Sequence, residues 1–302
     1  FAGYDMPVQY PTGVLKEHLH TRDAAGLFDV SHMGRMIVRG ADTLAYLQSL
    51  VPSDLSRLKD DGGCYTFLPN ENGGVVDDII VYRRTENEFW VVFNAGCLDK
   101  DRVWFQGHTA GFDVVIDDIT ERTGLLAVQG PAAMALLGDF VDSHARFGIG
   151  ETTFAGIAIT AARTGYTGED GFEISVPASD AERFAKLLLE QPEVKPIGLG
   201  ARDSLRLEAG LCLYGHDIDT TTTPVEAVLL WSVGKERRVQ GGFPGAAVVQ
   251  KQIAEGSPRK RVGLLPEGKA IAREGAEIAL SGGGVGKVTS GGFAPTLGRA
   301  VA

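Results

Sequence analysis

Glycine-centred turns between short apolar runs restrict how this chain can fold. It contains 40 glycines in 302 residues, well above the usual share of about 7%. Many of them gather in strings such as Asn72-Gly73-Gly74 and Gly282-Gly283-Gly284, which are typical of tight connections between strands. From Arg261 to the end, short β-type runs separated by glycine predict a small barrel or sheet.

Runs with helical spacing alternate with these strand-like runs. Apolar residues recur at helical spacing in residues 11–25 and 41–50, which predicts two amphipathic helices. Residues 65–68 and 79–82 flank the turn at 70–74 and predict a hairpin. Further strands are expected at 27–30, 36–38, 89–94, 111–116, 124–129, 156–162 and 172–176, and further helices at 97–104, 131–137, 181–190 and 201–209. The mixture predicts an α+β fold, and the length of 302 residues predicts two or three subdomains.

The charge pattern argues against nucleic acid and membrane as partners. The formal net charge is −10, and the densest basic strings, Lys235-Glu236-Arg237-Arg238 and Arg259-Lys260-Arg261, are short. A nucleic-acid surface needs a broad basic patch. No apolar stretch approaches the roughly 18 residues that a membrane-spanning helix needs, and the chain opens at Phe1 without a signal-peptide pattern.

The residues that bind metals or carry covalent catalysis form no familiar pattern in the sequence. Cys64, Cys97 and Cys212 lie far apart, so unpaired thiols in a reducing compartment are expected. His18 and His20 would point more than a right angle apart on a helix, which makes a poor metal pair. There is no Walker loop or nucleophile elbow. We therefore expect no metal.

Two neighbouring carboxylates, Asp77 and Asp78, begin an apolar strand directly after the turn at Gly73-Gly74. Neighbouring residues on a strand point to opposite faces, so at most one of them can face a pocket while the other meets water. A carboxylate beside an apolar wall can hold a cation or accept a proton. The alternative is a polar strand start, since Asp is common in turns.

Glu173 follows a glycine-rich string, Thr164 to Gly171, inside an apolar strand. Alternation puts Phe172 and Ile174 on one face of that strand and Glu173 on the other. The two oxygens of an inward-facing Glu match the parallel N–H groups of an amidine-like ring edge, such as that of a pterin or a guanine. A solvated surface Glu is the alternative.

Arg202 lies in the first turn of the helix that begins after Gly198-Leu199-Gly200. The Gly-x-Gly string lacks the third glycine and the preceding strand of a dinucleotide site. Arg202 could instead bind a carboxylate or a ring carbonyl oxygen, with the helix amides nearby. The alternative is a structural ion pair with Asp203 or Glu208.

Five ordered blocks together resemble one family. They are residues 26–34 (Gly-Leu-Phe-Asp-Val-Ser-His-Met-Gly), 72–80, 165–174, 198–219 and 289–298. The chain is similar over its whole length to the aminomethyltransferase T-proteins of the glycine cleavage system. The resemblance implies a fold of three subdomains in a cloverleaf around a central folate channel, with a C-terminal β-barrel-like piece.

The resemblance also implies approximate subdomain boundaries. Residues 1–40 with 125–210 are expected to form the first subdomain, residues 41–124 with 211–245 the second, and residues 246–302 an incomplete C-terminal β domain. Connections around 59–63 and 281–285 look shorter than the family's usual ones.

The implied reaction is one-carbon transfer. An aminomethyl group on the lipoyl arm of the H-protein would pass its carbon to tetrahydrofolate, releasing ammonia and giving 5,10-methylenetetrahydrofolate, with no metal. The expected location is the cytoplasm in a bacterium and the mitochondrial matrix in a eukaryote.

Carried onto matching positions, the resemblance implies one catalytic carboxylate, Asp77, which is preferred to Asp78 because the family places its functional Asp first in that pair. The implied folate contacts are Glu173, Arg202, Trp231, Tyr166, Met33, Tyr65 and Asn94. A fixed carboxylate in a partly dry pocket suits the cationic character of the transferred carbon. From the sequence, Trp231 could equally be a core residue.

Three alternatives share parts of these features. The folate domain of a dimethylglycine or sarcosine oxidase has this scaffold, but such chains add a flavin-binding portion with its own fingerprint. Folate binders that support iron–sulfur enzymes carry a Lys-Gly-Cys string, where this chain has Gly210-Leu211-Cys212. A plain folate-binding module would bind the ligand without turnover, and an intact Asp77 counts against it.

Overall fold

The first of two large β-sheets contains six strands. In spatial order they are β11 (Val194–Pro196), β1 (Ala25–Asp29), β7 (Thr123–Gln129), β10 (Gly171–Pro177), β9 (Ile157–Ala162) and β8 (Ile149–Phe154). These belong to a computed structural model that describes residues 1–138, 144–268 and 270–302. All neighbouring strands are antiparallel except β1 and β11. Helix α5 (Ala181–Leu189) covers one face, where Phe184 and Leu188 pack on Phe172 and Ile174.

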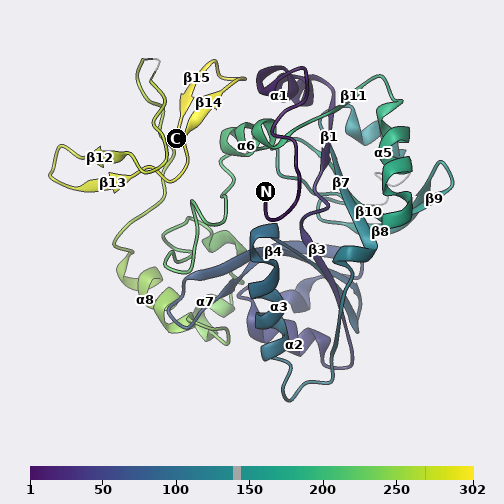
Figure 1. Cartoon of the computed structure of the whole chain (residues 1–302). Coiled ribbons are helices and arrows are strands. Elements are labelled where there is room, and N and C mark those ends of the chain that lie inside the picture. Colours follow the sequence, from purple (N-terminus) through teal and green to yellow (C-terminus); the bar gives the residue numbers. More distant parts are fainter. Residues whose placement is uncertain (139–143, 269) are drawn as a thin grey trace.

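The second sheet contains five antiparallel strands. In spatial order they are β3 (Gly62–Pro69), β4 (Val75–Thr85), β5 (Glu88–Phe93), β2 (Gly34–Arg39) and β6 (Val115–Asp118). Helices α2 (Thr43–Leu50) and α3 (Leu98–Gly107) lie on one side of it, below the sheet in Figure 1. Tyr46, Leu47 and Phe105 from these helices pack on Ile79 and Val81 of β4.

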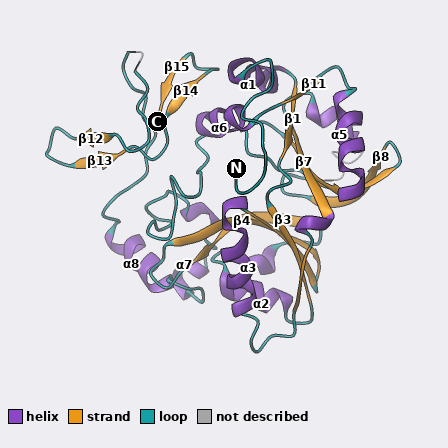
Figure 2. Ribbon diagram, viewed as in Figure 1, coloured by secondary structure: helices purple, strands orange, loops and turns teal. Residues whose placement is uncertain are grey.

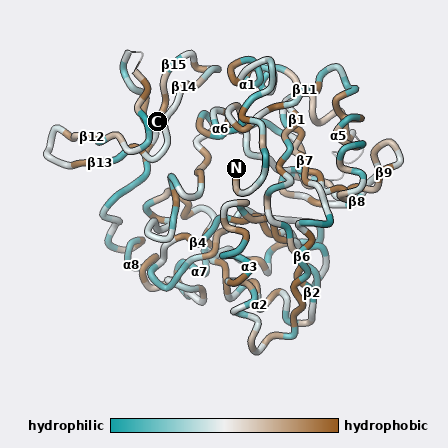
Figure 3. The backbone as a smooth tube through the Cα atoms, in the orientation of Figure 1, coloured by the Kyte–Doolittle hydropathy of each residue, from teal (hydrophilic) through white to brown (hydrophobic). Residues whose placement is uncertain are grey.

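A third apolar cluster joins the two sheets. Phe28 and Leu125 of the first sheet pack with Tyr82 and Val92 of the second. Helix α6 (Leu199–Glu208) contributes Leu205 to the same cluster, and helix α1 (Val14–Asp23) packs on α6. Figure 3 shows hydrophobic stretches along the strands of both sheets. The second sheet therefore has α2 and α3 on one face and the first sheet on the other.

The chain beyond α6 is less regular (Figure 2). Its helices are α7 (Arg237–Gln240) and α8 (Ala246–Glu255), and its strands form the pairs β12 (Glu277–Ala279) with β13 (Val285–Lys287) and β14 (Gly292–Ala294) with β15 (Arg299–Val301). The same region contains the short 3-10 turn η6 (Leu230–Ser232), and the 3-10 turns before α6 are η1 (Leu55–Arg57), η2 (Ala95–Cys97), η3 (Thr120–Arg122), η4 (Ala133–Leu137) and η5 (Ala178–Asp180).

Two of the expected subdomain boundaries differ from the packing. Strand β2, at residues 34–39, was expected in the first subdomain but pairs with β5 and β6 of the second sheet. Helix α8 was expected in the C-terminal domain, but its Val249 packs with Phe67 and Phe243 in a cluster of the second subdomain. The reason is that a local apolar pattern specifies an element without specifying its packing partner.

Candidate active site

Strand alternation sends the two carboxylates of β4 in opposite directions. Asp77 shares a face with Ile79, which packs with α2 and α3, whereas Asp78 shares a face with Tyr82, which lies between the sheets. Asp77 is fully buried and Asp78 is half-buried. The expectation that one carboxylate faces a pocket and the other meets water is therefore wrong for Asp77, because α3 covers its face of the sheet.

Asp78 forms the centre of a polar group on the inter-sheet face. Its carboxylate accepts hydrogen bonds from the Tyr65 hydroxyl at 3.1 Å and from Nδ2 of Asn94 at 2.8 Å. Burial, and then the negative charge of Asp77, raises the pKa of Asp78 to about 7. Asp78 can therefore gain or lose a proton near neutral pH.

Asn94 connects the two carboxylates. Its main-chain N–H donates to Oδ2 of Asp77 at 3.0 Å, and its Nδ2 donates to Oδ1 of Asp77 at 2.9 Å. The same Nδ2 lies 2.8 Å from Oδ1 of Asp78 and 3.1 Å from the Asp78 carbonyl oxygen. Asn94 thus fixes the orientation of both side chains.

Tyr65 connects Asp78 with Trp231, because its hydroxyl hydrogen-bonds to Asp78 and its ring contacts the Trp231 ring. The two rings are stacked, with centroids 5.4 Å apart and planes inclined by 26°. Trp231, on η6, is 64% exposed, so the alternative of a buried core tryptophan is excluded. A large, exposed aromatic face next to a half-buried carboxylate is suited to stacking on a flat ligand.

Arg202 supplies a cation from the first turn of α6. Its guanidinium carbon lies 4.7 Å from the centroid of the Tyr166 ring, and its Nη2 lies 3.9 Å from the sulfur of Met33. Its Nη1 is buried and has no hydrogen-bond partner within residues 1–138, 144–268 and 270–302. A buried, unpaired guanidinium nitrogen is costly, so this position is prepared for an acceptor that the chain itself does not provide.

Tyr166 lies between Arg202 and the segment after α6. Its hydroxyl donates to the carbonyl oxygen of Cys212. Burial raises the pKa of Tyr166, and the charges of Asp78 and Arg202 both act on it. Tyr166 therefore lies close enough to interact electrostatically with both Asp78 and Arg202.

Glu173 projects from β10 into the space between the sheets. Its Oε2 accepts from the Thr164 hydroxyl at 2.9 Å, and the hydroxyls of Thr164 and Tyr82 lie 3.2 Å apart. It is 7% exposed, and among the described residues it forms no ion pair. Phe172 and Ile174 pack on the opposite face, as alternation predicts. A cavity of about 20 Å³ lies beside Glu173.

Several neighbouring residues could not be found by sequence reasoning. His32 is buried with an unpartnered Nδ1, and burial, followed by the charge of Arg202, lowers its pKa to about 4. Cys97 and Asp101, one helical turn apart, both lie against Asp77: one oxygen or sulfur atom from each of the three lies within 4.8 Å of the others. The Cys97–Asp101 spacing of four residues was the available signal.

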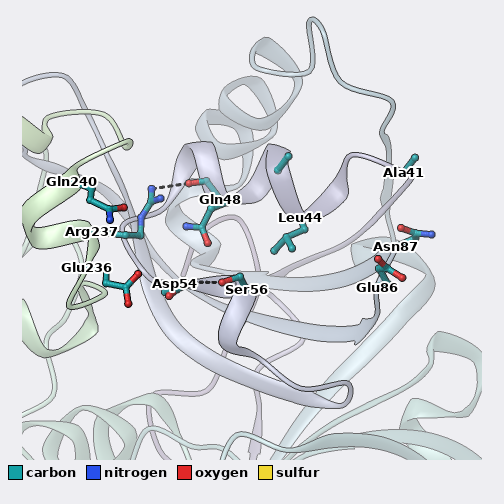
Figure 4. A pocket seen from close by; sticks show the side chains of 11 residues that line it. Ala41, Leu44, Gln48, Asp54, Ser56, Glu86, Asn87, Glu236, Arg237 and Gln240 are labelled. Carbon is teal, nitrogen blue, oxygen red and sulfur yellow. Dashed lines mark hydrogen bonds between the residues drawn. The ribbon is translucent and has the colours of Figure 1, made fainter.

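A larger pocket lies away from all of these residues. It measures about 510 Å³ and is lined by Leu44 and Gln48 of α2 together with Asp54, Glu236 and Arg237 (Figure 4). Nη2 of Arg237 donates to the Gln48 carbonyl oxygen at 2.8 Å. None of the predicted site residues lines this pocket.

Comparison with known proteins identifies the family. Residues 1–237 match the family model described as the GCVT N-terminal domain, and residues 259–302 match the glycine cleavage T-protein C-terminal barrel domain. The chain belongs to the glycine cleavage T-protein family. The predicted family and the mixed α/β fold with a C-terminal barrel domain are thereby confirmed.

Relatives in the T-protein family carry aminomethyltransferase names. The mitochondrial aminomethyltransferase of Gallus gallus is 47% identical over 312 residues, which cover 100% of this chain and 79% of the relative. The probable mitochondrial aminomethyltransferase of Schizosaccharomyces pombe is 44% identical over 308 residues, with the same shares covered. The crystal structure of glycine cleavage system aminomethyltransferase T from Bartonella henselae matches with a TM-score of 0.93 at 42% identity, covering 100% of this chain and 83% of that one.

Membership of the T-protein family makes the chain a transferase, as predicted, and the alternative functions are not favoured. In the part of the chain that the structure describes, no helix combines the length and the apolar character needed to cross a bilayer.

Proposed function

We propose that this T-protein family member transfers the one-carbon unit of an aminomethyl-lipoyl arm to tetrahydrofolate. The arm is carried by the H-protein of the glycine cleavage system. The carbon leaves both the lipoyl sulfur and the amino nitrogen and forms two bonds to folate nitrogens. The two protons of those nitrogens end on the lipoyl thiol and on ammonia. The product is 5,10-methylenetetrahydrofolate.

One observation carries this proposal. A half-buried carboxylate whose pKa lies near neutrality, Asp78, is held by Tyr65 and Asn94 on the inter-sheet face. Arg202 lies over the ring of Tyr166, on which the charges of Asp78 and Arg202 both act, and its buried Nη1 has no partner among the residues that the structure describes. Such a pair can hold a polar heterocycle and manage a proton on it.

The described residues fit a reduced folate. Glu173 offers a buried carboxylate to the parallel N–H groups of the pterin ring. Nη1 of Arg202, which lacks a partner in the described part of the chain, would donate to a ring carbonyl or a carboxylate. Tyr65 and Trp231 present stacked aromatic faces for the ring system. Tyr166 and Met33, both against Arg202, would line the same ligand.

Tetrahydrofolate supplies the nucleophilic nitrogens, and the chain supplies charge and position. We assign the catalytic carboxylate to Asp78 rather than Asp77. Both Asp77 oxygens already accept hydrogen bonds from Asn94, and its face of β4 is covered by α3. Ionised Asp78 would stabilise the positive charge of the transferred carbon in a water-poor site. Its near-neutral pKa would let it move a proton at the reacting nitrogen.

The lipoylated H-protein is the proposed partner. In a eukaryotic cell the proposed location is the mitochondrial matrix, in keeping with the names of the mitochondrial relatives, and in a bacterium it is the cytoplasm.

Ammonia release tests this function. Aminomethyl-lipoyl H-protein is incubated with the purified chain with and without tetrahydrofolate, and ammonia and methylenetetrahydrofolate are measured. We expect both products, in equal amounts, only when tetrahydrofolate is present. Tight folate binding without either product would instead indicate a binding module and would reject the proposal.

A further inference from the structure

A second polar group lies beneath the proposed site, on the other face of β4. It consists of Asp77 on β4, Cys97 at the end of η2 and Asp101 in the first turn of α3. All three residues are buried, and Asp101 is fully buried, with no donor to either carboxylate oxygen among the residues that the structure describes. A carboxylate with no donor at all in the interior needs a physical explanation.

Two neighbouring donors, Lys100 and Asn94, make their hydrogen bonds to groups other than Asp101. The Lys100 ammonium donates to the Val76 carbonyl oxygen and to the Tyr214 hydroxyl. Asn94 uses its main-chain N–H and its amide on Asp77. In the described part of the chain, the other titratable groups that act on Asp101 or lie against it are Asp77, Cys97 and, across β4, Asp78.

A bound proton resolves the arrangement without any further ligand. An ionised Asp101 beside an ionised Asp77 would place two like charges in the interior, which is strongly unfavourable. A protonated carboxyl is instead a donor, and a carboxylate oxygen has two lone pairs, so Asp77 can accept from it in addition to Asn94. Burial, and then the charge of Asp77, correspondingly raises the pKa of Asp101 far above its ordinary value.

We infer that Asp101 is a neutral carboxylic acid at physiological pH and donates a hydrogen bond to Asp77. This pair then positions Asn94, which orients Asp78 in the site above. Asp101 is thus a positioning residue that acts through three side chains rather than by touching substrate. The positioning role of Asp101 rests on the proposed function, whereas its protonation state does not.

The surroundings favour a proton over a metal cation at this position. Both oxygens of Asp77 are already engaged by Asn94. Burial, and then the charge of Asp77, raises the pKa of the Cys97 thiol, so it stays protonated and is a poor ligand. The Lys100 ammonium lies close enough to Cys97 to act on it electrostatically, and a second cation beside it would be repelled.

The positioning role has a simple geometric route. Asn94 makes two hydrogen bonds to Asp77, and the amide that makes one of them also contacts Asp78 at 2.8 Å. If Asp77 turns toward water or toward another donor, the Asn94 amide must turn with it. Asp78 then loses one of its two side-chain donors, and the orientation of its carboxylate changes.

Infrared spectroscopy of the purified full chain tests the protonation state without any turnover. The wild type should show the C=O stretch of a buried carboxylic acid that persists to pH 8.5, where ordinary carboxyls are ionised. Asp101→Asn should remove that band. Asp78→Asn, the matched control, should keep it and remove only a component that titrates near pH 7. A wild type without the persistent band, or a band that survives in Asp101→Asn, would overturn the inference.

Kinetics of two variants test the positioning role. Asp101→Asn keeps a side-chain donor, so kcat and the pH midpoint of kcat/KM should stay within about threefold and 0.3 unit of wild type. Asp101→Ala removes the donor, so kcat should fall at least about tenfold while KM for tetrahydrofolate stays within about twofold. Equal losses in both variants would show that a charge at position 101 is needed and would reject the role.

The two proposals fail in different ways. If Asp78→Asn retained full turnover while the infrared result held, the proposed catalytic role would fall and the protonated Asp101 would stand. If the infrared band were missing while Asp78→Asn was inactive, the reverse would be true.

Discussion

Asp77 and Asp78 are adjacent in the sequence but meet different surroundings. The first is enclosed by Asn94, Cys97 and Asp101, and the second by Asn94 and the Tyr65 hydroxyl. Only Asp78 lies on the face that the two sheets share. A carboxylate that must exchange protons with a ligand has to be reachable, and this requirement favours Asp78.

Substituting the two carboxylates separately distinguishes their roles. Asp78→Asn should lower kcat by about 10²- to 10⁴-fold, the usual contribution of a positioned acid or base, with folate affinity nearly unchanged. Asp77→Asn should mainly destabilise the fold, because it disturbs a buried network. The measurements are ammonia release and thermal unfolding of each variant. Wild-type turnover in Asp78→Asn would remove Asp78 from the mechanism.

The pH dependence of turnover follows from the pKa of Asp78. Its folded-state pKa is raised to about 7, and the ionised form is the one that stabilises a cation. We therefore expect kcat/KM to rise with pH through about 7 and then level off. Steady-state rates from pH 5.5 to 8.5 check this, and a profile that is flat across that window contradicts it.

Glu173 is expected to anchor the folate. Glu173→Ala should weaken tetrahydrofolate binding by about 10- to 100-fold, since a charge-assisted hydrogen bond contributes about 1.5–3 kcal/mol. Titration calorimetry measures this. Glu151→Ala, on the edge strand β8 of the same sheet with its side chain 75% exposed, is the control. Equal affinities of the two variants would reject the anchor role.

At the scale of elements, the junction of η2 with α3 places Cys97 and Asp101 against the Asp77 face of β4. Cys97 ends η2, and Asp101 follows within the first turn of α3. The turn places two polar side chains against a sheet face that α2 and α3 otherwise cover largely with apolar side chains. Polar groups at such a position are stable only when they satisfy each other.

Protonation of Asp101 makes the stability of the fold depend on pH. Its folded-state pKa is raised from 3.8 to about 10. The folded state therefore holds a proton that the unfolded chain has lost between about pH 4 and 10, and wild-type stability falls as pH rises through that window. Asn does not titrate, so the stability of Asp101→Asn should not fall in this way. The melting temperature of Asp101→Asn relative to that of wild type should therefore increase from pH 5 to pH 9.

An exposed carboxyl on the same helix provides the control for this experiment. The Asp99 side chain is fully exposed in α3, so Asp99→Asn should keep a constant offset from wild type across the same pH range. Scanning calorimetry at four pH values suffices. An Asp101→Asn offset that stays constant or shrinks with rising pH would contradict a protonated Asp101.

At the scale of the whole molecule, buried polar contacts tie the C-terminal region to α6. Arg206 donates to Asp217 at 2.8 Å and to the Ser290 hydroxyl at 2.9 Å. The Thr289 hydroxyl donates to Asp217 at 2.6 Å. The arrangement joins α6, the segment after it and the region before β14.

Removing Asp217 should destabilise the whole fold. Asp217→Ala removes the one buried carboxylate that pairs with Arg206 among the described residues, and breaking a buried ion pair costs about 3–5 kcal/mol. Although burial raises the pKa of Asp217, hydrogen bonds from Thr289 and the Leu213 N–H, with the charge of Arg206, hold it below its ordinary value. The loss should therefore be full above about pH 4 and shrink as pH falls below it. Urea unfolding at pH 7 and pH 3 measures both, and Asp203→Ala, at the exposed partner of Arg206, should cost far less.

Much of this protein is already determined by local patterns in its sequence. The hairpin around the turn at 70–74, the helix at 201–209 and the strand that turns Glu173 away from Phe172 all follow from spacing. Five motif blocks indicate the family. These features depend on residues close in the chain, whose backbone periods of 2 and 3.6 fix the relative directions of side chains.

The tertiary structure alone decided which of those directions leads to the site. Alternation requires Asp77 and Asp78 to diverge, but only the packing of α3 on one face and the first sheet on the other makes Asp78 the reachable one. The same holds for β2, for the exposed face of Trp231 and for the contact of Asp101 with Asp77. Each depends on partners distant in the chain, and no local period encodes which surfaces meet.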